Sequence, residues 1–182
     1  LLAVPGVEGA TLSDGLPAAG NGAIRVQIEG KAYSQESDHP LAREGIVTAG
    51  YFDTFQTKLL SGREFRTTDV ATTQPVAIIN ESFARLHFPN LDPMGRHFRR
   101  VIAALPNEPW LTVVGVVPDL LMEGIGNNNA SPVGYYIPIA QSDVGNAVRM
   151  VVRTRGEPGA MTSLVRSAVA ALDPDLAIYE IS

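Results

Sequence analysis

Stretches in which apolar and polar residues alternate, or in which apolar residues run together, recur along this chain and predict strands. Residues 24–29, I-R-V-Q-I-E, alternate strictly and predict a half-buried antiparallel strand. Residues 76–79 and 110–117 are largely apolar, which is typical of buried strands. Residues 96–103 are expected to pair with 110–117, and residues 147–154 to form a strand covered on both faces. Further strands are expected over residues 7–13, 43–47, 135–139 and 176–181.

Apolar residues at helical spacing follow two polar residues that are suited to begin helices. Thr48 and Asn80 each precede such a stretch, and their side chains are placed to accept hydrogen bonds from first-turn amides. Helices are therefore expected to begin after these two residues, and the pattern over 157–172 predicts a third. The apolar faces are, in chain order, Tyr51, Phe52, Phe55 and Leu59, then Phe83, Leu86 and His87, then Met161, Leu164, Val165, Ala168 and Leu172.

Two turns are expected between these elements. Gly62 follows Leu60-Ser61, and its freedom to adopt a positive φ predicts a sharp change of chain direction. The segment D-P-M-G at 92–95 predicts a second turn, in which the proline presets φ and a glycine follows closely. Because a side chain at position 62 would conflict with such a turn, we expect Gly62→Val to destabilise the domain.

The composition is that of an ordinary globular domain of 182 residues, with 45% apolar and 18% charged residues. A net charge of −5 argues against a nucleic-acid-binding protein, because phosphate recognition needs clustered Lys and Arg. The densest basic cluster, Arg96-His97-Arg99-Arg100, is interpreted as the solvent side of a strand. The absence of Cys excludes disulfides and thiolate metal sites. No apolar run approaches the roughly 20 residues that span a bilayer.

Residue types that carry out catalysis or bind metals are present, but their spacing supports neither role. The histidines His39, His87 and His97 form no H-x-x-x-H or H-x-H pair. There is no G-x-S-x-G, Walker A or G-x-G-x-x-G motif. Five acidic residues next to turns or helix starts are scattered, and capping or solvation explains them. They are Asp53, Glu64, Asp69, Asp119 and Glu123. We therefore predict no catalytic, cofactor-binding or metal-binding residues.

Five motifs between Val47 and Gly124 resemble one family, the MacB-like extracytoplasmic core domain of bacterial ABC-transporter permeases. They occur in the family's order and with similar spacing. One departure is Ala49, where the family usually has a proline. The motifs are T-A-G-Y-F at 48–52, L-L-S-G-R-E-F at 59–65, I-N-E at 79–81, D-P-M-G at 92–95 and V-V-G-V-V at 113–117.

The resemblance implies an α+β fold with two lobes. One is a discontinuous porter-like β-α-β lobe made of residues 1–45 plus 133–182. The other is an inserted mixed α/β lobe made of residues 46–132. The β-α-β pattern over 147–181 agrees with the first lobe, because residues 1–30 contain no helical pattern of their own to cover a sheet.

The resemblance also implies a function without catalysis, on the periplasmic side of the bacterial inner membrane. Transmembrane helices of the same permease, expected outside residues 1–182, would anchor the domain. An ABC ATPase would act on the cytoplasmic side, and a second permease half would complete a dimer. The domain would couple ATP hydrolysis to substrate export or release by mechanical transmission. Exporters of this type also use a periplasmic adaptor, so an adaptor and the export substrate are further candidate partners.

Two other functions stay open at this point. The chain is also compatible with a periplasmic ligand-binding or sensing module, which an apolar pocket between the lobes with convergent polar groups would favour. A secreted hydrolase has only the scattered carboxylates in its support. It would require two of them and a histidine within hydrogen-bond reach in a cleft.

Overall fold

The computed structural model describes residues 3–122, 132–142 and 148–172, and its strands belong to one mixed sheet. The strand that the sequence predicts over 176–181 lies outside the described residues. The other predicted strands are present with small shifts at their ends, and the pairing of residues 96–103 with 110–117 is confirmed. The mixed α+β composition that the sequence predicts is thus also the observed one.

Six of the strands form a closed barrel. In order around it they are β2 (Ala23–Ile28), β6 (His97–Val101), β7 (Leu111–Val117), β5 (Val76–Asn80), β8 (Gly134–Pro138) and β3 (Leu41–Val47). The row closes because β2 pairs with β6 on one side and with β3 on the other. Two pairs, β3–β8 and β5–β7, are parallel, and the other pairs in the ring are antiparallel.

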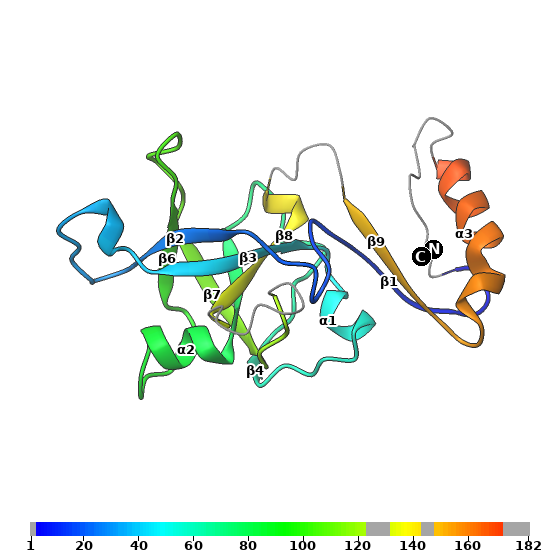
Figure 1. The fold of residues 1–182 in the computed structure, drawn as a ribbon, viewed down its shortest axis with the longest axis horizontal. Coiled ribbons are helices and arrows are strands. Elements are labelled where there is room, and N and C mark those ends of the chain that lie inside the picture. The colour runs from blue at the N-terminus through cyan, green and yellow to red at the C-terminus, as the bar shows by residue number, and fades with distance from the viewer. Residues whose placement is uncertain (1–2, 123–131, 143–147, 173–182) are drawn as a thin grey trace.

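The remaining large elements form an extension that we call the arm. It consists of β1 (Val7–Ser13), β9 (Arg149–Thr154) and the helix α3 (Pro158–Leu172). Figure 1 shows the arm at one end of the elongated molecule and the barrel at the other. β1 and β9 pair along their whole length, whereas β1 meets the barrel strand β3 only at Ser13 opposite Val47.

Alternation along the barrel strands divides the apolar residues between two packed clusters. Of two successive residues on a barrel strand, one enters the barrel interior, as Ile79 and Tyr135 do. This interior cluster also includes Phe83 of α2 (Glu81–His87). The other of the two residues faces outward, as Ile78 and Tyr136 do, and packs against α1 (Tyr51–Thr54). The period of two along each strand therefore produces both cores from the same elements.

The predicted start of the second helix is confirmed, whereas that of the first is wrong. The Asn80 side chain accepts a hydrogen bond from the Phe83 amide at 2.9 Å, as a helix cap does. Thr48 does not cap α1, because its hydroxyl bonds to β1 instead. The carboxylate of Glu64 accepts from the Phe52 amide at 3.2 Å and takes the capping role. Glu64, twelve positions after Phe52, thus takes the capping role that was expected of Thr48.

The first helix is also shorter than its apolar spacing predicts. α1 ends at Thr54, and Gln56 has a positive φ of 54° that breaks the helix. Phe55 and Leu59 still pack against the outer core from the following loop. The short elements β4 (Ser61–Gly62), η1 (Glu36–Asp38) and η2 (Ile139–Gln141) complete the described structure. Phe55 and Leu59 thus keep the packing predicted for them, although they lie in a loop and not in a helix.

Three predicted faces need correction. On α2, Phe83 and His87 are buried, but Leu86 is 57% exposed. On α3, Val169 is the buried residue, whereas Leu164 is 50% exposed and the last residue of the helix is 81% exposed. β9 is not covered on both faces, since its residues are exposed or half-buried. The arm is therefore less buried than the barrel.

The proposed division into lobes 1–45 plus 133–182 and 46–132 stays a prediction. Strands from both predicted lobes take part in the barrel: β2, β3 and β8 belong to the first, and β5, β6 and β7 to the second. The arm contains strands only from the first. The described sheet is continuous across the predicted boundaries.

Candidate functional site

The place where the arm joins the barrel is the first candidate site, and we call it the junction. Here β1 leaves β9 and meets the chain that follows β3. The amide of Leu12 donates to the Thr48 hydroxyl at 2.9 Å, and the hydroxyls of Thr11 and Thr48 lie 2.9 Å apart. The Thr48 amide also donates to the Leu12 carbonyl at 2.9 Å, so the Thr48 side chain reinforces the backbone pairing around Ser13 and Val47.

A carboxylate holds the other side of the junction. Asp14 accepts from the Ile46 amide through Oδ1 at 2.8 Å, and its own amide donates to the Ile46 carbonyl at 3.0 Å. Arg149 of β9 donates to the Asp14 carbonyl at 2.5 Å, so both arm strands are tied to the same point. No feature of the sequence around Asp14 marks it for this contact. Its role depends on a partner 32 residues away, which local pattern does not reveal.

A second candidate is a group of ionisable side chains in the barrel interior. Tyr135 donates to the Glu44 carboxylate at 2.7 Å, and Arg100 lies between Glu44, at 3.5 Å, and Glu108, at 2.5 Å. Burial raises the pKa of Glu44, with the Tyr135 hydrogen bond and the Arg100 charge acting against it. The tyrosine pKa is also raised, chiefly by burial. All four side chains find partners within the group, so we interpret it as a structural device.

The placement of Arg100 corrects the interpretation of the basic cluster as a solvent-facing row. Arg100 follows the buried Phe98 by two positions, so its side chain enters the barrel and is only 19% exposed. Glu44 similarly lies between Ala42 and Ile46 on the inward face of β3. A charged residue in register with buried apolar ones is the sequence signal that identifies this group.

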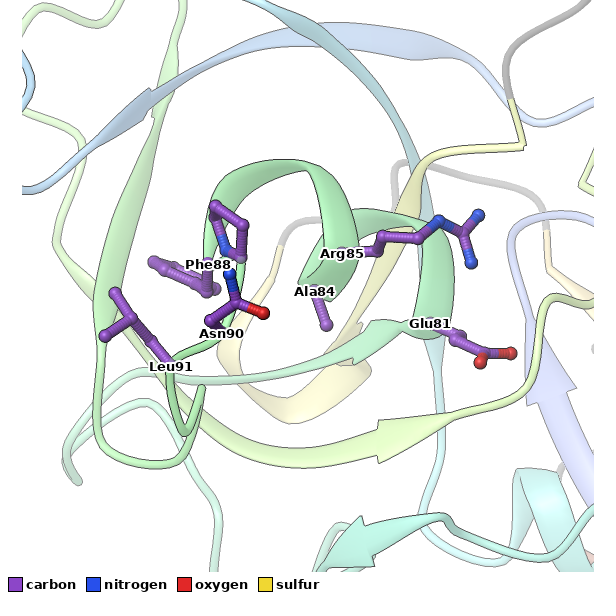
Figure 2. Close-up of a pocket in the computed structure, with 7 residues that line it drawn as sticks. Glu81, Ala84, Arg85, Phe88, Asn90 and Leu91 are labelled. Atoms are coloured by element: carbon purple, nitrogen blue, oxygen red, sulfur yellow. The ribbon is translucent and has the colours of Figure 1, made fainter.

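A shallow hollow of about 400 Å³ lies on α2 and the turn after it. Figure 2 shows its side chains spread around the end of one helix, with Glu81 and Arg85 on one side and Asn90 and Leu91 on the other. One continuous segment lines it, so it does not lie between lobes. The remaining lining residues are Ala84, Phe88 and Pro89. It therefore lacks the convergent polar groups from several elements that a ligand pocket needs.

The acidic residues considered as acid–base candidates do not come together as a catalytic pair. Asp69 binds Arg63 through both oxygens, at 2.7 and 3.0 Å. Asp119 accepts from the amide and the hydroxyl of Ser82 at the start of α2. Asp53 is exposed and lies near Glu64, whose pKa is raised by burial first and by Asp53 second. Glu123 lies outside the described residues.

The histidines are likewise apart from one another. His39 stacks on Tyr33 in an exposed loop, and His97 lies 2.9 Å from Glu29 on the barrel surface. His87 is buried against Phe83. Within the residues that the structure describes, no three His, Asp or Glu side chains are grouped to hold a metal ion.

The buried side chain of His87 is expected to make the folded protein less stable in mild acid. Burial, followed by the charge of Lys31, lowers its pKa from 6.5 to about 4. The folded protein therefore binds this proton less readily than the unfolded chain, and stability falls as the pH drops from about 6.5 to 4. The loss amounts to about 3 kcal/mol. Urea unfolding of wild type and His87→Leu across this range measures it, and the variant should lose less.

His39→Leu is the matched control, because His39 is exposed. It should retain the full acid loss. An identical pH dependence in His87→Leu and wild type would contradict the assignment of a buried neutral histidine.

Both the sequence and the fold of this chain resemble those of known proteins. A family model described as the MacB-like periplasmic core domain matches residues 4–172. The structure resembles the periplasmic region of MacB from Actinobacillus actinomycetemcomitans with a TM-score of 0.62 and 17% identity, covering 93% of this chain and 69% of that one. It resembles the extracellular domain of the ABC-type transporter YknZ from Gram-positive bacteria with a TM-score of 0.54 and 16% identity, covering 88% and 72%. No curated protein sequence matches.

These likenesses, at such low identity, establish a shared fold. In the part of the chain that the structure describes, no helix is both long and apolar enough to cross a bilayer.

Proposed function

Because this chain belongs to the family of MacB-like periplasmic core domains of ABC transporter permeases, we propose that it transmits movement and performs no catalysis. It acts outside the cytoplasm, on the periplasmic side of the bacterial inner membrane, and is anchored by transmembrane helices of the same permease. ATP binding and hydrolysis on the cytoplasmic side move those helices, and the domain carries the movement to the exported substrate. A second permease half, and in some systems a periplasmic adaptor, are its further partners.

The observation that carries this proposal is the construction of the junction. β1 runs from the arm into the barrel, and hydrogen bonds around Asp14 and Thr48, together with the packing of α1 against β1 and β9, set the angle between the two bodies. The barrel is closed and packed on both sides of its wall, so it moves as one unit. Such an arrangement concentrates bending at the junction.

A spin-label measurement on the intact permease tests this transmission. The chain has no Cys, so Ala104→Cys introduces a single thiol of this domain on an exposed barrel hairpin. The distance between the labels of the two copies is measured with and without a non-hydrolysable ATP analogue. We expect the nucleotide to shift this distance. If the permease hydrolyses ATP but the distance between the labels is the same with and without the nucleotide, mechanical transmission through the domain is excluded.

Asp14→Ala in the same labelled protein tests the junction itself. Removing the acceptor of the Ile46 amide weakens the junction by about 1–3 kcal/mol, so the distance distribution should broaden while the ATPase rate stays unchanged. Asp53→Ala is the matched control, because that exposed carboxylate does not bridge arm and barrel. A ligand-binding or sensing function receives less support, since the hollow on α2 is open and formed by one segment.

A further inference from the structure

The sequence contains one Asn-Gly step, Asn21-Gly22, and it lies immediately before β2. Asparagine followed by glycine is the pair most prone to deamidation, because glycine has no side chain to keep its backbone nitrogen away from the asparagine carboxamide. In a folded protein the reaction also requires that this nitrogen and this carboxamide are not held by other groups. The hydrogen bonds around Asn21 and Gly22 therefore decide whether the site is reactive.

The pairing of β2 with β3 ends at Gly22 in a rung with one hydrogen bond. The Glu44 amide donates to the Gly22 carbonyl at 3.0 Å, one position beyond the pair of Ala23 and Arg43. The Gly22 amide does not donate in return to Glu44, and it has no acceptor among the residues that the structure describes. Gly22 is also exposed. Its nitrogen is thus accessible to solvent base and free to act as a nucleophile.

The carboxamide of Asn21 also lacks a hydrogen-bond partner within the described part of the chain. Its backbone is held on both sides, because the Asn21 amide donates to the Met122 carbonyl at 2.7 Å and the Asn21 carbonyl accepts from Arg43 at 2.6 Å. The side chain lies against Gly15, where an added Cβ would come within 2.8 Å of Asn21 Nδ2. The local hydrogen bonds therefore leave out both groups that react in deamidation.

We propose that Asn21 is a site of spontaneous modification, at which the carboxamide is converted to a carboxylate. The Gly22 nitrogen loses its proton to solvent base and attacks Asn21 Cγ, and the carboxamide nitrogen takes up a proton and leaves as ammonia. Water then opens the cyclic succinimide at one of its two carbonyl carbons. One opening gives aspartate, and the other gives isoaspartate, in which the backbone runs through the former side chain. Water is the only co-reactant.

The modification affects both the β2–β3 pairing and the junction next to it. Each product carries a negative charge beside the turn that follows Asp14, because the Asn21 side chain lies against Gly15. This charge repels the Asp14 carboxylate, which holds the junction. Isoaspartate has a further effect, since its extra backbone carbon displaces the Gly22 carbonyl from the Glu44 amide. The pairing at the start of β2 is therefore loosened as the protein ages.

Peptide mapping by mass spectrometry tests the site in the folded protein, held at physiological temperature and mildly alkaline pH. We expect Asn21 to be modified about tenfold faster than Asn90 and Asn107, which precede leucine and glutamate. Gly22→Ala is the matched control. A Cβ at position 22 meets nothing within 4 Å, and Gly22 has no positive φ, so the fold is retained. The added methyl group hinders the attack and should slow the reaction about tenfold.

A synthetic peptide of residues 16–27 shows whether the fold permits the reaction. If Asn21 in the folded protein stays unmodified after the peptide has been fully converted, the proposal is overturned. Equal rates in wild type and Gly22→Ala would overturn it as well. Hydrogen exchange of the Glu44 amide then tests the loosened pairing. We expect faster exchange in the isoaspartate form, separated by chromatography, than in Asn21→Asp. Equal exchange in these two forms would exclude the displacement of the Gly22 carbonyl.

Discussion

Gly62→Val should destabilise the protein by about 4 kcal/mol, which is a large part of the stability of a typical domain. Gly62 has a φ of +77°, a conformation that costs an L-residue about 1–2 kcal/mol. A side chain there also has no space. A Cβ would lie 2.7 Å from Met94 Sδ and 2.8 Å from the Gly115 Cα, with the Val114 carbonyl oxygen closer still. Most of these atoms belong to the backbone of β7, which cannot move without breaking its pairing with β5.

Gly30→Val provides the matched control for this prediction. Gly30 has the same φ of +77°, but nothing lies within 4 Å of its Cβ position. It should therefore report the backbone cost alone, about 1–2 kcal/mol. Thermal and urea unfolding of both variants measure the difference. Equal losses in the two variants would show that β4 does not pack closely on β7.

The second large effect is expected from Arg100→Leu in the barrel interior. This change leaves the carboxylates of Glu44 and Glu108 buried without their shared cation, which typically costs about 3–5 kcal/mol. Arg99→Leu is the control on the neighbouring residue, since Arg99 lies over Trp110 on the outer side of the same strand. A cation–π contact at a partly exposed site contributes only about 1 kcal/mol. The comparison therefore separates an inward from an outward arginine.

The pH dependence of Arg100→Leu identifies the cause of its loss. The pKa of Glu44 is already raised by burial, and Arg100 is one of the groups that hold it down. Without Arg100 the folded state binds a proton on Glu44 more readily than the unfolded state does. The variant should regain stability as the pH falls toward the acid range, and lose it as the pH rises through the raised pKa. Chemical denaturation at several pH values measures this. A constant deficit at every pH would indicate a packing defect instead.

Strands and their approximate limits could be predicted because alternation is a local property of the chain. Residues 24–29 show this, and the Asn80 cap was equally local. The closure of the barrel was not predictable, because the β2–β3 and β2–β6 pairings join segments that no pattern relates. The end of α1 at Thr54 was missed for a similar reason. Its apolar spacing continues to Leu59, but Gln56 takes a positive φ that lets Leu59 reach the outer core from a loop.

Among the functional regions, too, some features could be predicted from the sequence and others could not. Membership of the family followed from motifs at turns and helix starts, such as Gly62 and Asn80, where backbone geometry restricts the residue. The junction was not visible, because Thr48 and Asp14 bond to segments more than thirty residues away. The inward pair Glu44 and Arg100 does leave a signal in the sequence, because each stands in register with apolar residues on its own strand.

Barrel closure also affects how this protein behaves at high protein concentration. An unpaired strand edge can recruit the edge of another molecule and begin aggregation. In the ring, β2 is bonded to both β6 and β3, so none of the six strands lacks a neighbour. Among the described strands, unmatched backbone donors and acceptors are thus confined mainly to the arm. The barrel therefore offers no open strand edge as a template for amyloid-like growth.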